Sequence, residues 1–260
     1  MSSASTMGTK SQAPSPAAAE IDPADPHKGA KVREMFAGIA GRYDLLNRVL
    51  SGGRDQAWRR RAVKMTALRG GETILDCCCG TGDLTLLFAS AEPAPARVVG
   101  ADFTPEMLRI AQKKTRELAA AMKLPAYSAA DGLRLPFADA SFDVVSVAFG
   151  VRNFQDVNAG LKDLIRVLRP GGRLVILEFT PVRNWFWRAL TSVHLNHMVP
   201  LIGQIVSRSR HQAYRYLPKS IGVFPDAEEL KGRLEGLGLR EVHYRKLNLR
   251  TVAIHVGTKG

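Results

Sequence analysis

Acidic residues stand inside or at the end of three stretches that are typical of buried strands, and two glycines follow the first of these stretches. The residues that this pattern brings forward are Asp76, Gly80, Thr81, Gly82, Asp102 and Asp131. Glycines let a backbone approach a ligand closely, and carboxylates accept hydrogen bonds from hydroxyl and amino groups. The pattern therefore predicts a site for a cationic ligand that carries hydroxyl and amino groups.

The spacing of the glycines separates two kinds of nucleotide-like ligand. A dinucleotide site requires Gly-x-Gly-x-x-Gly, but Thr85 stands where its third glycine is expected. The loop at 76–82, DCCCGTG, instead fits the acidic pattern that binds S-adenosylmethionine, whose sulfonium is cationic. We expect Asp102 to accept both ribose hydroxyls, Asp131 to accept from the adenine amino group, and Asp76 also to accept N–H groups of the turn. The full set of predicted cofactor residues is Asp76, Gly80, Thr81, Gly82, Asp102, Phe103, Asp131, Gly132 and Ala148.

Cysteines occur only in the block at 77–79, immediately before these glycines. A structural zinc site needs about four ligands, usually in spaced pairs, and a single contiguous block does not provide them. A disulfide between adjacent cysteines strains the backbone, and the chain shows no secretory signal. We therefore expect no metal, and interpret the cysteines as small side chains packed beneath the turn.

The composition is that of a globular protein with an unusual charge. The chain has 260 residues, 45% hydrophobic and 23% charged, and a net charge of +13. Such a charge favours nucleic acid, an anionic membrane surface or an anionic ligand as partner. Since no apolar run reaches the roughly 18 residues of a membrane span, we expect a cytoplasmic protein, peripheral at most on the inner face of a membrane.

Strands alternate with helices from residue 72 onward. Strands are predicted at 72–79, 97–103, 125–131, 142–150 and 172–179, and helices at 83–91, 105–122 and 157–168. The tail at 240–259 is typical of two strands joined by a short turn. The fold class is therefore α/β, a doubly wound, mostly parallel, Rossmann-like sheet of seven strands with an antiparallel C-terminal pair. Ligands of such sheets bind at the carboxyl ends of the strands, where the strand order reverses.

The remaining segments complete one domain. Residues 1–30 are rich in Ser, Ala and Pro, which predicts a disordered tail. Residues 31–260 form the single domain, with a helical N-terminal lid at 31–66 that is broken near Gly52 and Gly53. Residues 181–225 contain basic and aromatic side chains but no acids, which is typical of a cap insertion that packs over the pocket or touches a membrane surface.

Four stretches resemble a known family. They are YDLLNRVLSGGRDQAW (43–58), FGVRN (149–153), RVLRPGGRLVILEFT (166–180) and YRYLPKSIGVFPD (214–226). They resemble the signatures of the ubiquinone/menaquinone biosynthesis C-methyltransferases, which are class I S-adenosylmethionine-dependent methyltransferases. The resemblance covers residue 31 to the end. It implies C-methylation of a polyprenylated quinol ring, as from demethylmenaquinol to menaquinol.

This chemistry assigns candidate catalytic residues. The reduced ring becomes a better nucleophile when a hydroxyl loses its proton, so the enzyme has to position the ring and move that proton. Arg152 and Asn153 follow the strand at 142–150, where the methyl group is delivered, and are predicted to stabilise the phenolate and to bind a ring oxygen. Tyr43 and Asp44 on the lid are predicted to close over the ring, with solvated helix ends and caps as the alternative for all four.

The expected partners are the polyprenylated quinol and a transient membrane contact, with no nucleic acid. An RNA methyltransferase, or one acting on another small molecule, is the alternative that the charge suggests. The chain lacks the Asn/Asp-Pro-Pro-Tyr motif of enzymes that methylate base amino groups. The sequence leaves open whether the ring is a naphthoquinol or a benzoquinol, the tail length, and whether the protein is a homodimer.

Overall fold

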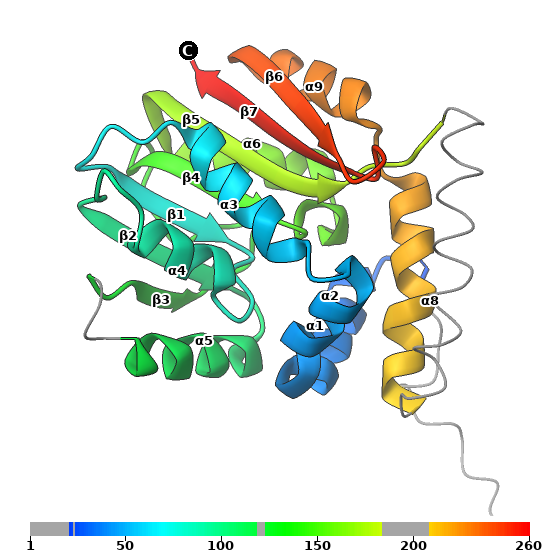
Figure 1. Cartoon of the computed structure of the whole chain (residues 1–260). Helices are drawn as coiled ribbons and strands as arrows, with labels where there is room; N and C mark the ends of the chain where they lie inside the picture. Colours follow the sequence, from blue (N-terminus) through cyan, green and yellow to red (C-terminus); the bar gives the residue numbers. More distant parts are fainter. Residues whose placement is uncertain (1–20, 23, 119–122, 184–207) are drawn as a thin grey trace, which may run out of the picture.

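The computed structural model describes residues 21, 22, 24–118, 123–183 and 208–260 (Figure 1). The helices are α1 (Lys28–Ile39), α2 (Tyr43–Ser51), α3 (Asp55–Thr66), α4 (Asp83–Ala89), α5 (Pro105–Glu117), α6 (Val157–Val167), α8 (Arg208–Val223) and α9 (Ala227–Gly236). The strands are β1 (Thr73–Cys77), β2 (Arg97–Asp102), β3 (Ala126–Ala129), β4 (Phe142–Ala148), β5 (Leu168–Phe179), β6 (Leu239–Leu247) and β7 (Val252–Lys259). Short 3-10 turns, η2 (Ala40–Arg42) and η4 (Val151–Asn153), precede α2 and α6.

The strands form one seven-stranded sheet in the order β3-β2-β1-β4-β5-β7-β6. Strands β1 to β5 pair in parallel, while β7 pairs antiparallel with both β5 and β6. The strand order reverses between β1 and β4, so the loops that follow these two strands diverge and leave a crevice. The predicted doubly wound sheet with an antiparallel C-terminal pair is confirmed.

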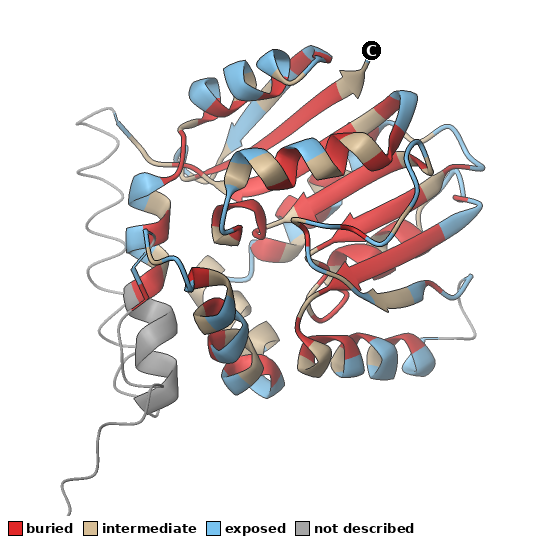
Figure 2. Ribbon diagram, turned by 180° about the vertical axis from the view of Figure 1, so that it is seen from behind, coloured by how far each residue is buried: buried red, intermediate tan, exposed pale blue. Residues whose placement is uncertain are grey.

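Helices cover both faces of the sheet. On one face α4 packs on Ile74 of β1, and α3 places Trp58 against β5 and β7. On the other face α6 packs on β5, and α9 packs on β6 and β7. Figure 1 shows α3, α4 and α5 on one side, with α6 and α9 on the other. Consequently the central strands are almost wholly buried (Figure 2), as expected for a parallel sheet with both faces covered.

The Pro170-Gly171-Gly172 turn lies inside β5 and not before it. The structure begins β5 at Leu168, directly after α6, so the predicted start at 172 is four residues late. Phe142 pairs with Leu168 while Val144 already pairs with Arg173, so this register shift accommodates the turn. Gly171 takes a φ of +74°, which an L side chain rarely adopts.

The N-terminal helices and α8 stand together at the carboxyl ends of the strands (Figure 1). The lid begins earlier than predicted, since α1 starts at Lys28 and Ile21 is buried against Met35 and Tyr216. The predicted disordered tail therefore extends too far toward α1; its first twenty residues lie outside the described part of the chain. Much of the predicted cap insertion, residues 184–207, also lies outside it, including Trp185, Phe186 and Trp187.

Candidate functional site

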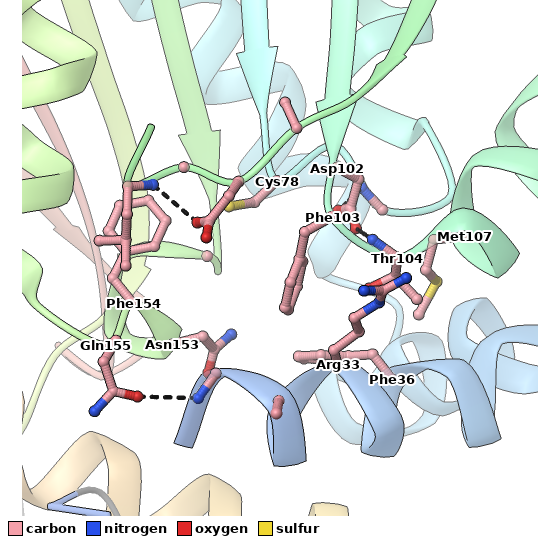
Figure 3. A pocket seen from close by; sticks show the side chains of 18 of the residues that line it. Arg33, Phe36, Cys78, Asp102, Phe103, Thr104, Met107, Asn153, Phe154 and Gln155 are labelled. Carbon is pink, nitrogen blue, oxygen red and sulfur yellow. Dashed lines mark hydrogen bonds between the residues drawn. The ribbon is translucent and has the colours of Figure 1, made fainter. Parts of the chain in front are cut away.

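A cavity of about 400 Å³ lies at the carboxyl ends of the central strands, where the strand order reverses. The ends of β1, β2 and β4 form its upper walls, and α1 closes it from below (Figure 3). Of the predicted site residues, those that line it are Tyr43, Gly80, Asp102, Phe103, Asp131, Gly132, Ala148 and Asn153. The sequence pattern thus locates most of this wall.

The turn after β1 has a left-handed backbone at three positions. Cys78, Gly80 and Gly82 have φ of +56°, +55° and +84°. Gly80 faces the cavity, and a Cβ added to it meets only the Tyr43 ring, at 3.8 Å. The backbone at Gly80 therefore stays open to a ligand, as predicted.

Gly82 is required for a different reason from the one predicted. It does not line the cavity; a Cβ there would stand 2.9 Å from the Tyr127 hydroxyl oxygen and 3.0 Å from Cβ of Ala111. Both distances are shorter than a packed Cβ contact tolerates. Gly82 therefore allows α5 and β3 to pack against the start of α4.

Asp102 holds the turn that Asp76 was predicted to hold. Its two carboxylate oxygens accept the N–H groups of Gly80, at 2.9 Å, and of Thr104, at 2.8 Å. Each oxygen keeps a second lone pair for a ligand hydroxyl. Burial raises the pKa of Asp102, while these backbone N–H groups oppose the rise.

Asp76 lies beneath the turn and accepts side-chain hydroxyl groups. Thr85 Oγ1 and Ser146 Oγ donate to it at 2.6 and 2.8 Å, and no backbone N–H of the turn does. Burial raises the pKa of Asp76 to about 6. A nearby cation would favour its charged form.

Asp131, Gly132 and Phe103 line the cavity from the segments that follow β3 and β2. Asp131 is exposed and its carboxylate accepts the Leu133 N–H at 2.9 Å, so a free lone pair faces the cavity. A Cβ on Gly132 would stand 2.5 Å from Phe154, which explains the glycine there. These residues suit the predicted adenine position.

The lid is tied to the turn by Asp44. Thr81 Oγ1 donates to Asp44 at 2.6 Å, and Lys114 of α5 pairs with Asp44 at 2.5 Å and with Asp83 at 2.7 Å. Asp44 does not line the cavity, whereas its neighbour Tyr43 does. The structure therefore gives Asp44 a holding role and brings only Tyr43 of this pair to a ligand.

Arg152 is buried behind the cavity and not in it. Its guanidinium donates to Glu178 and to the Phe149 carbonyl, both at 2.7 Å, and lies 5.3 Å from the centre of the Phe179 ring. Arg152 does not line the cavity, so its guanidinium is not placed to contact a ring oxygen directly. Arg152 thus pairs with Glu178, and its burial excludes the alternative of a solvated helix end.

Asn153 presents an unpaired acceptor at the cavity wall. Its Nδ2 donates to the Phe149 carbonyl at 3.2 Å, and its buried Oδ1 has no hydrogen-bond partner among the described residues. A buried acceptor without a partner costs about 1–3 kcal/mol. A ligand hydroxyl that donates to Oδ1 would remove this cost.

The three cysteines are free, and two of their thiols hold their protons firmly. The neighbouring thiol of Cys77, together with burial, raises the pKa of Cys78 well above its ordinary value, and burial does the same for Cys79. Cys78 packs so closely on Gly150 that a Cβ there would lie 2.5 Å from Cβ of Cys78. This is the behaviour of compact packing residues.

Two basic residues at the site were not predicted. Arg33 of α1 lines the cavity opposite Asp102 (Figure 3), and Arg59 of α3 is buried next to the turn. A signal for Arg59 was available, because the buried positions of α3 are 55, 58, 59, 62 and 66. Arg59 lies on this buried face of the helix. In the sequence, however, three consecutive arginines after Trp58 suggest a solvent-exposed segment.

Comparison with known proteins gives both a family and a fold. The model of the ubiE/COQ5 methyltransferase family matches residues 25–259. Demethylmenaquinone methyltransferase of Thermus thermophilus is 45% identical over 225 residues, which are 86% of this chain and all of that protein. The ubiquinone/menaquinone biosynthesis C-methyltransferase UbiE of Geotalea daltonii is 40% identical over 232 residues, 89% of this chain and 97% of its own.

Solved structures with the same fold are more distant in sequence. The [4+2]-cyclase SpnF superposes with a TM-score of 0.63 at 18% identity, over 89% of this chain and 96% of its own. A possible histamine N-methyltransferase of Thermotoga maritima superposes with a TM-score of 0.59 at 16% identity, over 87% and 99% of the two chains. These likenesses support the fold assignment.

Proposed function

The chain belongs to the ubiE/COQ5 methyltransferase family, and on that premise we propose that it transfers the methyl group of S-adenosylmethionine to a ring carbon of a polyprenylated quinol. Demethylmenaquinol is the substrate that the names of its relatives favour. The observation that carries the proposal is one cavity with two kinds of wall. Carboxylates stand at the ends of β2 and β3, and the aromatic rings of Phe36, Phe149 and Phe154 line other parts of it.

The residues of the cavity fit the cofactor. Its volume of about 400 Å³ is in the range of small-molecule sites, roughly 300–1,000 Å³. Asp102 would hold the ribose hydroxyls, Asp131 the adenine amino group, and the open backbone at Gly80 the part of the cofactor that crosses β1. The bound cofactor supplies an electrophilic methyl group on a cationic sulfur.

Asn153 and Tyr43 are the residues that we propose to contact the quinol. The unpaired Asn153 Oδ1 accepts a ring hydroxyl and so fixes the orientation of the ring. Burial raises the pKa of Tyr43, which therefore stays protonated and serves as a hydrogen-bond donor and an apolar wall. The surrounding apolar side chains exclude water and so strengthen the attraction between a developing phenolate and the cationic cofactor.

Arg152 and Asp44 act as positioning residues in this proposal. Arg152 and Asn153 both donate to the carbonyl of Phe149, so Arg152 fixes the backbone from which Asn153 projects. Asp44 holds the lid on Thr81 and thereby keeps Tyr43 over the cavity.

The test is methyl transfer to short-tailed reduced demethylmenaquinone, followed by mass spectrometry, beside the benzoquinol precursor and an RNA substrate. We expect a monomethylated quinol and an equal amount of S-adenosylhomocysteine. Asn153→Ala should lower kcat/KM for the quinol at least ten-fold, because an oriented hydrogen bond is lost, and leave S-adenosylhomocysteine affinity unchanged. Methylation of RNA with no quinol product would refute the proposal.

We also propose a transient contact with a membrane surface, because the substrate tail is lipid-soluble. Leu45 and Val49 lie exposed one turn apart on α2, and Arg42 and Arg54 near its two ends are exposed as well. No helix in the described residues is both long and apolar enough to span a bilayer. Sedimentation with anionic vesicles should pull down the wild type and less of a Leu45→Ser/Val49→Ser variant. The homodimer stays a prediction.

A further inference from the structure

A small recess opens off the cavity at the turn after β1. It measures about 20 Å³, which is room for one water-sized group. It shares Tyr43, Cys78, Gly80 and Ala148 with the cavity, so the two spaces adjoin. Its other walls carry charge, from Asp76, Asp83 and Arg59.

Arg59 is the one basic residue in the lining of this recess, among the residues that the structure describes. It is 5% exposed and lies 5.6 Å from the centre of the Phe149 ring. One nitrogen, NH1, donates to Asp55 at 2.7 Å. No other hydrogen bond to described residues occupies its remaining N–H groups, and none of them is buried without a partner, so they face accessible space. A buried guanidinium with spare donors is a site for a carboxylate.

The strand order says which end of the cofactor reaches this recess. Asp102 stands at the end of β2, and the recess opens at the turn after β1, the neighbouring strand. Neighbouring strands are about 4.8 Å apart, so with adenine at Asp131 and ribose at Asp102 the rest of the cofactor extends past Gly80 toward the recess. The amino-acid end of S-adenosylmethionine, an ammonium and a carboxylate, is the part that arrives there.

We propose that Arg59 binds the carboxylate of the amino-acid end of S-adenosylmethionine, while Asp76 faces its ammonium group. The opposite charges of the recess walls match this zwitterion. Asp83 is less available, because Gln56 donates to it and Lys114 and Arg48 pair with it. The inference rests on the proposed methyltransferase function and deepens it.

The test compares ligands that differ only in the amino-acid end. S-Adenosylhomocysteine carries the ammonium and the carboxylate, and 5′-methylthioadenosine carries neither. By calorimetry, Arg59→Met should weaken S-adenosylhomocysteine binding about ten-fold to a hundred-fold, the value of a charge-assisted hydrogen bond. Its affinity for 5′-methylthioadenosine should not change. Arg60→Met, an exposed neighbour on the same helix, is the matched control and should change neither affinity.

Asp55 keeps Arg48 as a partner when Arg59 is removed, so we expect Arg59→Met to fold. If it does not, the wild type still decides: an S-adenosylhomocysteine analogue without its carboxylate should bind at least ten-fold more weakly than the parent. Equal binding of analogue and parent, or an equal loss for both ligands in Arg59→Met, overturns the role of Arg59. Failure of the wild type to bind S-adenosylhomocysteine at all would instead overturn the proposed function.

Discussion

The buried pair of Arg152 and Glu178 gives a prediction in which a second substitution repairs the damage of the first. The two side chains are 7% and 2% exposed and 2.7 Å apart. Arg152→Met removes the cation and leaves the Glu178 carboxylate buried without it. Breaking one side of such a pair typically costs about 3–5 kcal/mol of the free energy of unfolding.

Glu178 also accepts the backbone N–H groups of Arg152 and Phe179, at 3.3 and 2.8 Å. Glutamine keeps a carbonyl oxygen for these donors and removes the charge. Adding Glu178→Gln to Arg152→Met should therefore recover about 2 kcal/mol, because the unpaired buried charge is the main cost. The double variant should be more stable than Arg152→Met, and the coupling energy of the cycle should exceed about 2 kcal/mol.

Urea unfolding at pH 7, followed by circular dichroism, measures all four proteins of the cycle. Arg109 and Glu106 provide the control pair, at 3.5 Å and with side chains 72% and 42% exposed. Their coupling energy should lie below about 1 kcal/mol, as for other exposed pairs. The reasoning fails if the double variant is less stable than Arg152→Met, or if the buried and exposed pairs couple equally.

Three further predictions concern single residues. Burial lowers the pKa of His255 from 6.5 to about 4. Between pH 6.5 and pH 4 the imidazole therefore binds a proton only in the unfolded state, so the free energy of unfolding decreases as the pH falls. His255→Gln should remove that loss, about 3 kcal/mol at most, seen as the difference between wild-type and variant unfolding curves from pH 7 to pH 4. Gly82 has a φ of +84° and faces Tyr127, so Gly82→Ala should lower the free energy of unfolding in urea by at least about 2 kcal/mol. Gly38 occupies an open position in a helix, so the control Gly38→Ala should raise the free energy of unfolding by up to about 1 kcal/mol. Cys78→Gly should stay within about 1 kcal/mol of the wild type and bind S-adenosylhomocysteine normally, since glycine adopts φ +56° freely; a ten-fold loss of affinity would give the thiol a role in binding.

The sequence predicts those features that follow from local periodicity. The carboxyl ends of parallel strands meet at one edge, so Asp102, Gly80 and Asp131 could be placed together without knowing any distance. The surroundings of Gly82 could not be predicted, because they depend on how α5 packs against the turn. The burial of Arg152 depends in the same way on Glu178, 26 residues later.

Helix rotation accounts for the other differences. Arg59 points toward the recess because α3 turns its Trp58 face toward β5 and β7, and the sequence pattern alone does not fix which flank of that face meets a ligand. The start of the lid was predicted too late because Ile21 is an isolated apolar residue in a polar segment. Its burial against α1 and α8 arises only from tertiary packing.

The contact of Asp44 with Thr81 and Lys114 has a consequence for turnover. These two contacts hold the lid against the turn that is proposed to carry the cofactor. S-adenosylhomocysteine therefore leaves only after the contacts break, or after the lid and the turn move together. Both charged side chains are partly exposed, and salt weakens such pairs. Product departure should therefore quicken with ionic strength, and the rate-limiting step can shift from departure to chemistry without any change in the reacting groups.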